Sequence, residues 1–192
     1  MKGLVLCLLF LFAIVPDMQA ENLQIESVQA SFVQQKNMAI LARPLLSHGR
    51  FLFQAPDSLR WEYYTPLHSV LLMDKGRIRK FIEQDGKFIE EHGMGLSAMQ
   101  VVMQEISGWL AGNISDTATF LAQQTDAKHV LLTPRGPALA KIISRIELTL
   151  LNERSGLLES VTLYEGKNSS TRMDFSDAKI NESIPVTLFQ QP

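Results

Sequence analysis

Few residues of this 192-residue chain have the type and spacing that chemistry requires. The four histidines are far apart in the sequence, and none has a partner at metal-ligand spacing: His48, His68, His92 and His129. Each is therefore interpreted as a surface histidine or a structurally satisfied one. Glu90 and Glu91 are adjacent, so they point to opposite sides of any strand and are poorly placed for paired acid–base chemistry.

Nucleophile and phosphate motifs are missing as well. No serine stands in a Gly-x-Ser-x-Gly elbow. The pair Gly93-Met-Gly95 lacks the third glycine and the following Lys-Ser that a phosphate-binding loop needs. We therefore predict no catalytic residues, no metal site and no cofactor, in a protein that is not an enzyme.

The N-terminal segment has the pattern of a secretory signal peptide. Lys2 precedes an apolar run at residues 3–15, which is too short to span a bilayer and ends at Pro16. Because Ala20 offers a cleavage site, we predict a signal peptide at residues 1–20 and a single mature domain at residues 21–192. An uncleaved anchor is the alternative, and the short run argues against it.

Cys7, the one cysteine of the chain, lies inside this apolar run. A lipid-anchored cysteine would follow a full apolar run, so Cys7 is interpreted as part of the discarded segment. The mature chain then has no disulfide and no thiol chemistry. An exported domain without disulfides is typical of the periplasm of a Gram-negative bacterium, and we predict this location.

Charge and length exclude further classes of function. Removing residues 1–20 takes away one lysine and one aspartate, so the formal net charge stays at −2. Without a basic excess, nucleic acid is not an expected partner. The remaining length suits one domain with a sizeable core, and a monomer is expected because no coiled-coil pattern is present.

Residues 49–66 read as two strands around a Pro-Asp-Ser turn. Their apolar positions alternate with polar ones and should share a face: Phe51, Phe53, Leu59, Trp61 and Tyr63. Polar side chains such as Arg60 and Glu62 point the other way. This period of two predicts a half-buried antiparallel hairpin, and leaves open whether its aromatic face meets protein or a ligand.

Most of the remaining chain alternates in the same way. Residues 21–28 read as a short helix, and residues 30–40 as a strand. The turn signals Asp74-Lys75-Gly76 and Asp85-Gly86 predict two hairpins. Further strands are expected at residues 120–124, 129–133, 145–150, 157–163 and 171–175. Frequent turns without long helices predict an antiparallel meander in one large sheet or barrel, with one apolar face and one face that is polar throughout.

Residues 96–110 change to a helical period. The apolar stripe of this helix consists of Leu96, Met99, Val102, Met103, Ile106, Trp109 and Leu110. The helix must cover part of the apolar sheet face, and two interpretations remain open. It packs as an ordinary core, or it is a movable lid over a face that binds a hydrophobic ligand. Methionine adapts to variable apolar shapes, although ordinary cores contain it too.

The order of several short motifs resembles the LolA family. Phe32-x-Gln34-x-Lys36 is followed by Gly49-x-Phe-x-Phe, then by "LRWEYYTP" and "LLMDKG". The resemblance implies a mainly β fold with a helical lid (α+β): a curved, incomplete antiparallel β-barrel covered by short helices. It also implies a periplasmic carrier that shields lipoprotein acyl chains in an apolar cavity. The implied partners are an inner-membrane ABC transporter of LolCDE type and an outer-membrane receptor of LolB type.

Under this resemblance the sheet and the lid together form a lipid-binding site. The expected lining residues are Phe51, Phe53, Leu59, Trp61 and Tyr63 from the sheet, and Met99, Val102, Met103, Ile106, Trp109 and Leu110 from the lid. The family resemblance also implies a lid-holding arginine just before Pro56, where this chain has Ala55; Arg60 lies nearby. The alternatives are a carrier or sensor of another lipid, such as a glycolipid or polyene lipid, and an enzyme of lipid metabolism, which the missing catalytic groups disfavour.

Overall fold

The computed structural model describes residues 25–92, 105–106, 108–109, 114–151, 157–166 and 168–192. Within them the chain is mainly β, and eleven strands form one antiparallel sheet. The strands are β1 (Ser27–Asn37), β2 (Leu45–Gln54), β3 (Ser58–Thr65), β4 (Ser69–Asp74), β5 (Arg77–Gln84), β6 (Lys87–Glu91), β7 (Phe120–Gln124), β8 (His129–Pro134), β9 (Ile143–Leu150), β10 (Leu158–Glu165) and β11 (Ser169–Ile180). The short helical elements in this part are α2 (Pro137–Ala140) and η1 (Val186–Phe189).

The sheet has the order β6-β5-β4-β3-β2-β1-β11-β10-β9-β8-β7. Neighbouring strands are consecutive in the sequence except for β1 and β11, which pair from Val28↔Ile180 to Asn37↔Ser170. This pairing joins two meanders into one sheet. The two edge strands, β6 and β7, are consecutive in the chain but lie at opposite ends of the sheet.

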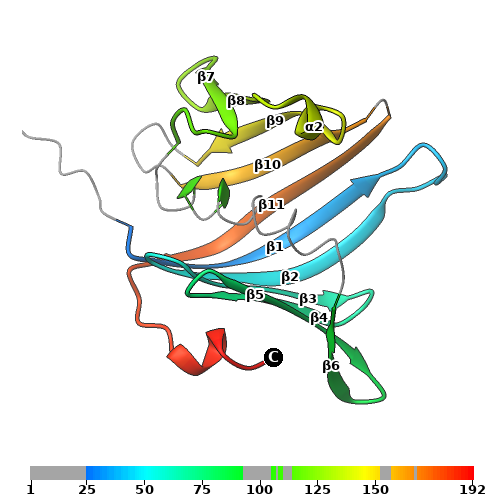
Figure 1. The fold of residues 1–192 in the computed structure, drawn as a ribbon, viewed down its shortest axis with the longest axis vertical. Coiled ribbons are helices and arrows are strands. Elements are labelled where there is room, and N and C mark those ends of the chain that lie inside the picture. Colours follow the sequence, from blue (N-terminus) through cyan, green and yellow to red (C-terminus); the bar gives the residue numbers. More distant parts are fainter. Residues whose placement is uncertain (1–24, 93–104, 107, 110–113, 152–156, 167) are drawn as a thin grey trace, which may run out of the picture.

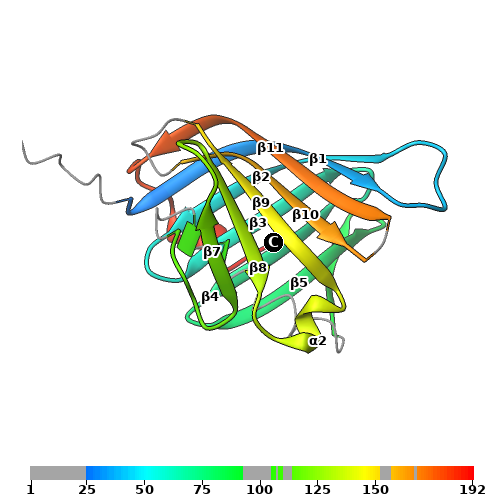
Figure 2. The ribbon, with the colours of Figure 1, turned by 90° about the horizontal axis from the view of Figure 1, so that it is seen from above.

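Strong curvature brings the two halves of the sheet face to face. Figures 1 and 2 show β7, β8 and β9 lying above β3, β4 and β5, with β1 and β11 forming the bend between them. The sheet therefore has a concave inner face and a convex outer face, and its order leaves it open between β6 and β7. The predicted curved and incomplete antiparallel barrel is confirmed as an open antiparallel sheet.

The two hairpins that turn chemistry predicted are confirmed. Lys75 and Gly76 join β4 to β5 with φ angles of 51° and 74°, and Asp85 and Gly86 join β5 to β6 with the same values. Positive φ at both central residues matches the right-handed twist of the flanking strands, and glycine adopts it without a Cβ clash.

The predicted helix at residues 21–28 is wrong where it can be compared. Ser27 and Val28 begin β1, and residues 21–24 lie outside the described part. Val28 pairs with Phe53 in β2 and with Ile180 in β11. These two ladders satisfy the backbone on both sides, which outweighs a weak local helix preference.

The predicted helix at residues 96–110 falls mostly outside the described residues. Residues 105–106 and 108–109 are helical, and the structure describes no other part of it. A helical lid over the sheet therefore stays a prediction. The short helix α2 lies between β8 and β9.

The outer face is not polar throughout, so that prediction is wrong. Leu52 alternates with Phe51 and Phe53, yet it is buried on the opposite face with Ile184 and Phe189. The C-terminal segment with η1 covers this part of the convex side (Figure 1). We call residues 181–192 the C-terminal strap. Because the strap comes from the far end of the chain, strand periodicity could not reveal it.

Candidate functional site

Strands β2 and β3 place the five predicted aromatic and aliphatic residues on the inner face. The register pairs Phe51 with Trp61 and Phe53 with Leu59, and Tyr63 lies opposite Gly49. The first four are at most 2% exposed, and Tyr63 packs partly buried against the same cluster. The prediction that these five share one apolar face is confirmed.

An edge-to-face aromatic cluster forms the middle of this face. The Phe32 ring centroid lies 5.4 Å from that of Trp61 and 5.2 Å from that of Tyr63, at steep interplanar angles of 61° and 83°. Phe51 meets Trp61 at 5.4 Å in the same manner. Such pairs place a positive ring edge on a negative ring face, which orients the rings.

The Phe32-x-Gln34-x-Lys36 motif supplies three successive layers of the inner face. Phe32 belongs to the aromatic cluster. The Tyr63 hydroxyl donates a hydrogen bond to Gln34 Oε1 at 2.7 Å, and Lys36 Nζ lies 3.2 Å from Glu165 Oε2. The inner face thus becomes polar and then charged toward the hairpin that joins β1 to β2. Burial raises the pKa of Tyr63 to about 12, so its hydroxyl stays a neutral donor.

The opposite half of the inner face comes from β8 to β11. Its buried residues include Leu132, Ile146, Leu148, Val161, Leu163 and Met173. They belong to the same contiguous cluster as Phe51 and Trp61. Their alternation along the strands is visible in the sequence, but these residues were not among the predicted site residues. Only the β1–β11 pairing and the curvature bring the two halves together, and no local signal predicts that contact.

Two of the predicted lid residues reach this cluster. Ile106 and Trp109 are 2% and 1% exposed and pack with the sheet residues. The Trp109 ring lies 5.9 Å from that of Phe120, which begins β7. Thr117 Oγ1 also donates to Glu105 Oε1 at 3.1 Å. The other predicted lid residues, Met99, Val102, Met103 and Leu110, lie outside the described residues.

Comparison with known proteins decides the family. The family model described as outer membrane lipoprotein carrier protein LolA matches residues 23–192. The chain belongs to the LolA family. No curated protein matches it.

Solved structures resemble this LolA-family chain at low sequence identity. They include a DUF1329 family protein from Desulfovibrio piger, with 11% identity, a TM-score of 0.48 and coverage of 86% of this chain and 90% of that one. A LolA superfamily protein from Nitrosomonas europaea has 14% identity, a TM-score of 0.41 and coverage of 86% and 90%. LprF from Mycobacterium bovis has 11% identity, a TM-score of 0.41 and coverage of 84% and 89%. The family assignment rests on the family model alone.

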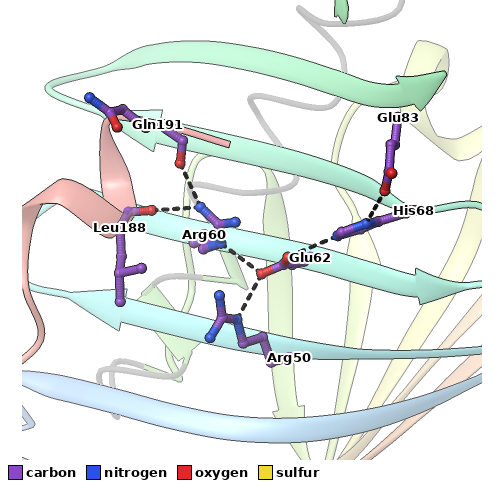
Figure 3. A network of polar contacts seen from close by, with 7 residues as sticks. All are labelled: Arg50, Arg60, Glu62, His68, Glu83, Leu188 and Gln191. Carbon is purple, nitrogen blue, oxygen red and sulfur yellow. Dashed lines mark hydrogen bonds and ion pairs between the residues drawn. The ribbon is translucent and has the colours of Figure 1, made fainter. Parts of the chain in front are cut away.

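A polar cluster centred on the buried side chains of Arg60 and Glu62 lies on the outer face of this LolA-family sheet (Figure 3). Glu62 is 5% exposed and accepts hydrogen bonds from Arg50 Nε at 2.7 Å and Arg60 Nε at 2.8 Å. His68 Nε2 lies 3.0 Å from Glu62 Oε1, and His68 Nδ1 contacts Glu83. Sequence analysis missed this cluster, because alternation placed its members on a face assumed to meet water.

The cluster shifts two pKa values in opposite directions. Burial alone would raise the pKa of Glu62, but hydrogen bonds from Arg60, His68 and Arg50 outweigh burial and lower the pKa to about 2. The hydrogen bond to Glu62 raises the pKa of His68, burial opposes this rise, and Glu83 reinforces it. Both groups are therefore favoured in their charged forms. The polar side chains of the cluster satisfy one another's hydrogen bonds.

Arg60 does not replace the lid-holding arginine that the family resemblance implies at the position of Ala55. It points to the outer face, where Arg60 Nη1 donates to the carbonyl oxygens of Leu188 at 3.0 Å and Gln191 at 2.7 Å (Figure 3). Its guanidinium thus ties the C-terminal strap to β3. Leu59 and Trp61, its neighbours in the strand, face the opposite way into the core.

The other histidines and glutamates that were considered as candidates for catalysis or metal binding are exposed or paired. His48 and His92 are exposed, and His129 Nδ1 lies 2.8 Å from Asp126 Oδ1 in the β7–β8 turn. Glu90 and Glu91 alternate along β6, as predicted. Among the described residues, no group of three or more His, Cys, Asp or Glu side chains could hold a metal ion. None of the helices searched in this part is long and apolar enough to cross a membrane.

Proposed function

We propose that this LolA-family protein is a periplasmic carrier that shields lipoprotein acyl chains and transfers them from the inner to the outer membrane. The observation that carries the proposal is the contiguous apolar inner face, with Ile106 and Trp109 packed against it. The carrier is exported by a cleaved signal peptide, residues 1–20. Its partners are the acyl chains, a LolCDE-type ABC transporter that loads it and a LolB-type receptor that unloads it.

The closed packing of the inner face suits a lid that moves. Phe51 and Leu59 are fully buried, and Trp109 is 1% exposed. An acyl chain therefore needs the helical residues around Trp109 to separate from β7 and from the sheet. Without a ligand, an open apolar face of this size would favour aggregation, so closure protects the empty carrier.

The energetics favour a site built of many weak apolar contacts. Each methylene removed from water contributes about 0.8 kcal/mol, so a free acyl chain does not cross an aqueous compartment unaided. A carrier also has to release the chain, so its affinity should approach that of the membrane. An inner face with aromatic and aliphatic residues and few directional partners meets both needs.

Two indole groups offer polar contacts to an acylated ligand. The N–H groups of Trp61 and Trp109 are buried and have no hydrogen-bond acceptor among the described residues. A buried donor without a partner is costly, by about 1–3 kcal/mol. The ester and amide carbonyls that attach acyl chains to a lipoprotein are suitable acceptors, and binding them would satisfy these donors.

Brominated acyl chains test the proposal directly, because Trp61 and Trp109 are the two tryptophans of the chain and both lie in the inner-face cluster. A bromine atom quenches indole fluorescence only on close approach. We expect a brominated fatty acid to quench both single-tryptophan variants, Trp61→Phe and Trp109→Phe, while aqueous acrylamide quenches them poorly. Quenching of neither variant would contradict an acyl-chain site on this face.

A second variant separates the lid from the sheet. Trp109→Asp should weaken acyl-chain binding while the sheet stays folded by circular dichroism. The matched control is Phe189→Ala, which removes an equally buried ring from the outer face beneath the C-terminal strap. If both variants bind equally well, the helical residues are not a lid.

Mass spectrometry of lipid extracted from the protein purified from periplasm identifies the cargo. Bound lipoprotein supports the proposal. A defined glycolipid or polyene lipid supports a carrier or sensor of that lipid instead, which the substitution of Ala55 for the expected arginine favours. Repeated absence of any lipid counts against both functions.

A further inference from the structure

The hairpin between β1 and β2 carries a cluster of exposed apolar side chains. Residues 39–46 are all exposed. Four of them, which we call the hairpin tip, are large and apolar: Ile40, Leu41, Leu45 and Leu46, with Ile40 87% exposed and Leu46 52% exposed. Exposed apolar clusters of this kind mark interaction sites, because contact between apolar surface and water is unfavourable.

The tip projects beyond the strands that flank it. β3 pairs with β2 only as far as His48↔Thr65, and β11 pairs with β1 as far as Asn37↔Ser170. Residues 38–44 of the hairpin continue past both ladders. Figures 1 and 2 show this hairpin reaching past the ends of the other strands, from two perpendicular views. The tip is thus a narrow, convex projection.

The charged side chains of residues 27–56 are all cationic: Lys36, Arg43 and Arg50. Lys36 is paired with Glu165 and Arg50 with Glu62, so Arg43 supplies the charge at the tip. Arg43 is exposed between the two apolar pairs of the tip. On the neighbouring strand ends, Glu165 is already held by Lys36 at 3.2 Å and by Thr171 Oγ1 at 3.1 Å. Apolar side chains beside a cation match the interface of an anionic bilayer, where acyl chains lie just beneath negative headgroups.

We propose that the hairpin tip inserts into the interface of an anionic phospholipid bilayer. Its convex shape fits between lipid headgroups, and its exposed arginine lies where it can meet their phosphates. The polar end of the inner face, at Gln34 and Lys36, lies on β1, just behind the tip. Docking by the tip therefore orients that end toward the membrane. The inference goes beyond the proposed function, because contact with a bilayer does not require an acyl chain in the core.

Cosedimentation with vesicles tests the tip. We expect the full mature protein to bind vesicles of phosphatidylglycerol and phosphatidylethanolamine more strongly than vesicles of phosphatidylcholine. The double variant Ile40→Asp/Leu46→Asp should lower partitioning onto the anionic vesicles about tenfold or more. Arg43→Glu should reduce the preference for anionic lipid. The matched control is Val186→Asp, at an apolar side chain 62% exposed on η1, and it should bind as the unchanged protein does.

A fluorescent probe locates the contact. Since Cys7 lies in the signal segment, Leu41→Cys gives the mature protein one thiol for an environment-sensitive dye, which should shift to the blue on anionic vesicles. The proposal would be overturned if the unchanged protein did not bind vesicles, or if the Val186→Asp control lost as much binding as the tip variants. It would also be overturned if the tip variants lost binding to a protein partner and kept their binding to vesicles. Quenching by brominated fatty acid should persist in the tip variants, so failure here is distinguishable from failure of the acyl-chain site.

Discussion

Phe32 and Gly49 face each other across the β1–β2 pair, and the Phe32 ring occupies the space that a side chain at position 49 would need. A Cβ atom on Gly49 would lie 2.5 Å from Phe32 Cζ and 2.0 Å from the carbonyl oxygen of Glu62. The glycine of the Gly49-x-Phe-x-Phe motif thus lets the aromatic cluster lie directly on the backbone.

Gly49→Ala should lower the free energy of unfolding by about 1–3 kcal/mol, because the contact with a backbone oxygen cannot be relieved by turning a side chain. Urea denaturation measures the change. Gly136→Ala is the control, since a Cβ atom there meets nothing within 4 Å. Equal stability of the two variants would show that the strand yields at Gly49.

Glu62→Gln should destabilise the fold by about 3 kcal/mol, because it leaves the buried Arg60 guanidinium without its counter-charge. The control is Asp174→Asn, which alters an exposed pair with Arg172 and should change stability by less than about 0.5 kcal/mol. Thermal unfolding of both variants provides the comparison. A Glu62→Gln variant as stable as the control would mean that the cluster contributes little.

The same cluster predicts a pH dependence with two limbs. The pKa of Glu62 is lowered from 4.5 to about 2, so its contribution is present above pH 4.5 and is lost as pH falls toward 2. The pKa of His68 is raised from 6.5, so its contribution is complete below pH 6.5 and is lost as pH rises through the raised value. Melting temperature against pH should show both limbs. His68→Gln should remove the alkaline limb and also weaken the acid limb, because the His68 hydrogen bond helps to lower the pKa of Glu62. An unchanged alkaline limb would exclude His68 as its source.

Local chemistry made much of the fold predictable. Lys75-Gly76 and Asp85-Gly86 mark their hairpins because the positive φ that these turns require is readily adopted by Gly76, Gly86 and Asp85. Alternation placed Phe51 and Trp61 on one face because side chains in a strand have a period of two. The family resemblance supplied the curved barrel, which alternation left as either a sheet or a barrel.

Other features depended on contacts between distant segments. Ser27 and Val28 form a strand because β2 and β11 lie on either side of them. Arg60 is buried where the carbonyl oxygens of Leu188 and Gln191, from the far end of the chain, accept hydrogen bonds from its guanidinium. Glu62 lies among Arg50, Arg60 and His68. The sequence analysis placed Arg60 and Glu62 on the correct face and misjudged what that face meets.

The sequence by itself determined which side chains share a strand face and where the hairpins turn, since both depend on neighbours within a few residues. Only the tertiary structure decided that Leu132, Ile146 and Val161 join Phe51 in one buried cluster, and that Arg60 holds a C-terminal strap. Those contacts depend on the β1–β11 pairing and on curvature accumulated over eleven strands. Local periodicity carries no information on either one, because it is the same in a flat sheet and in a curled one.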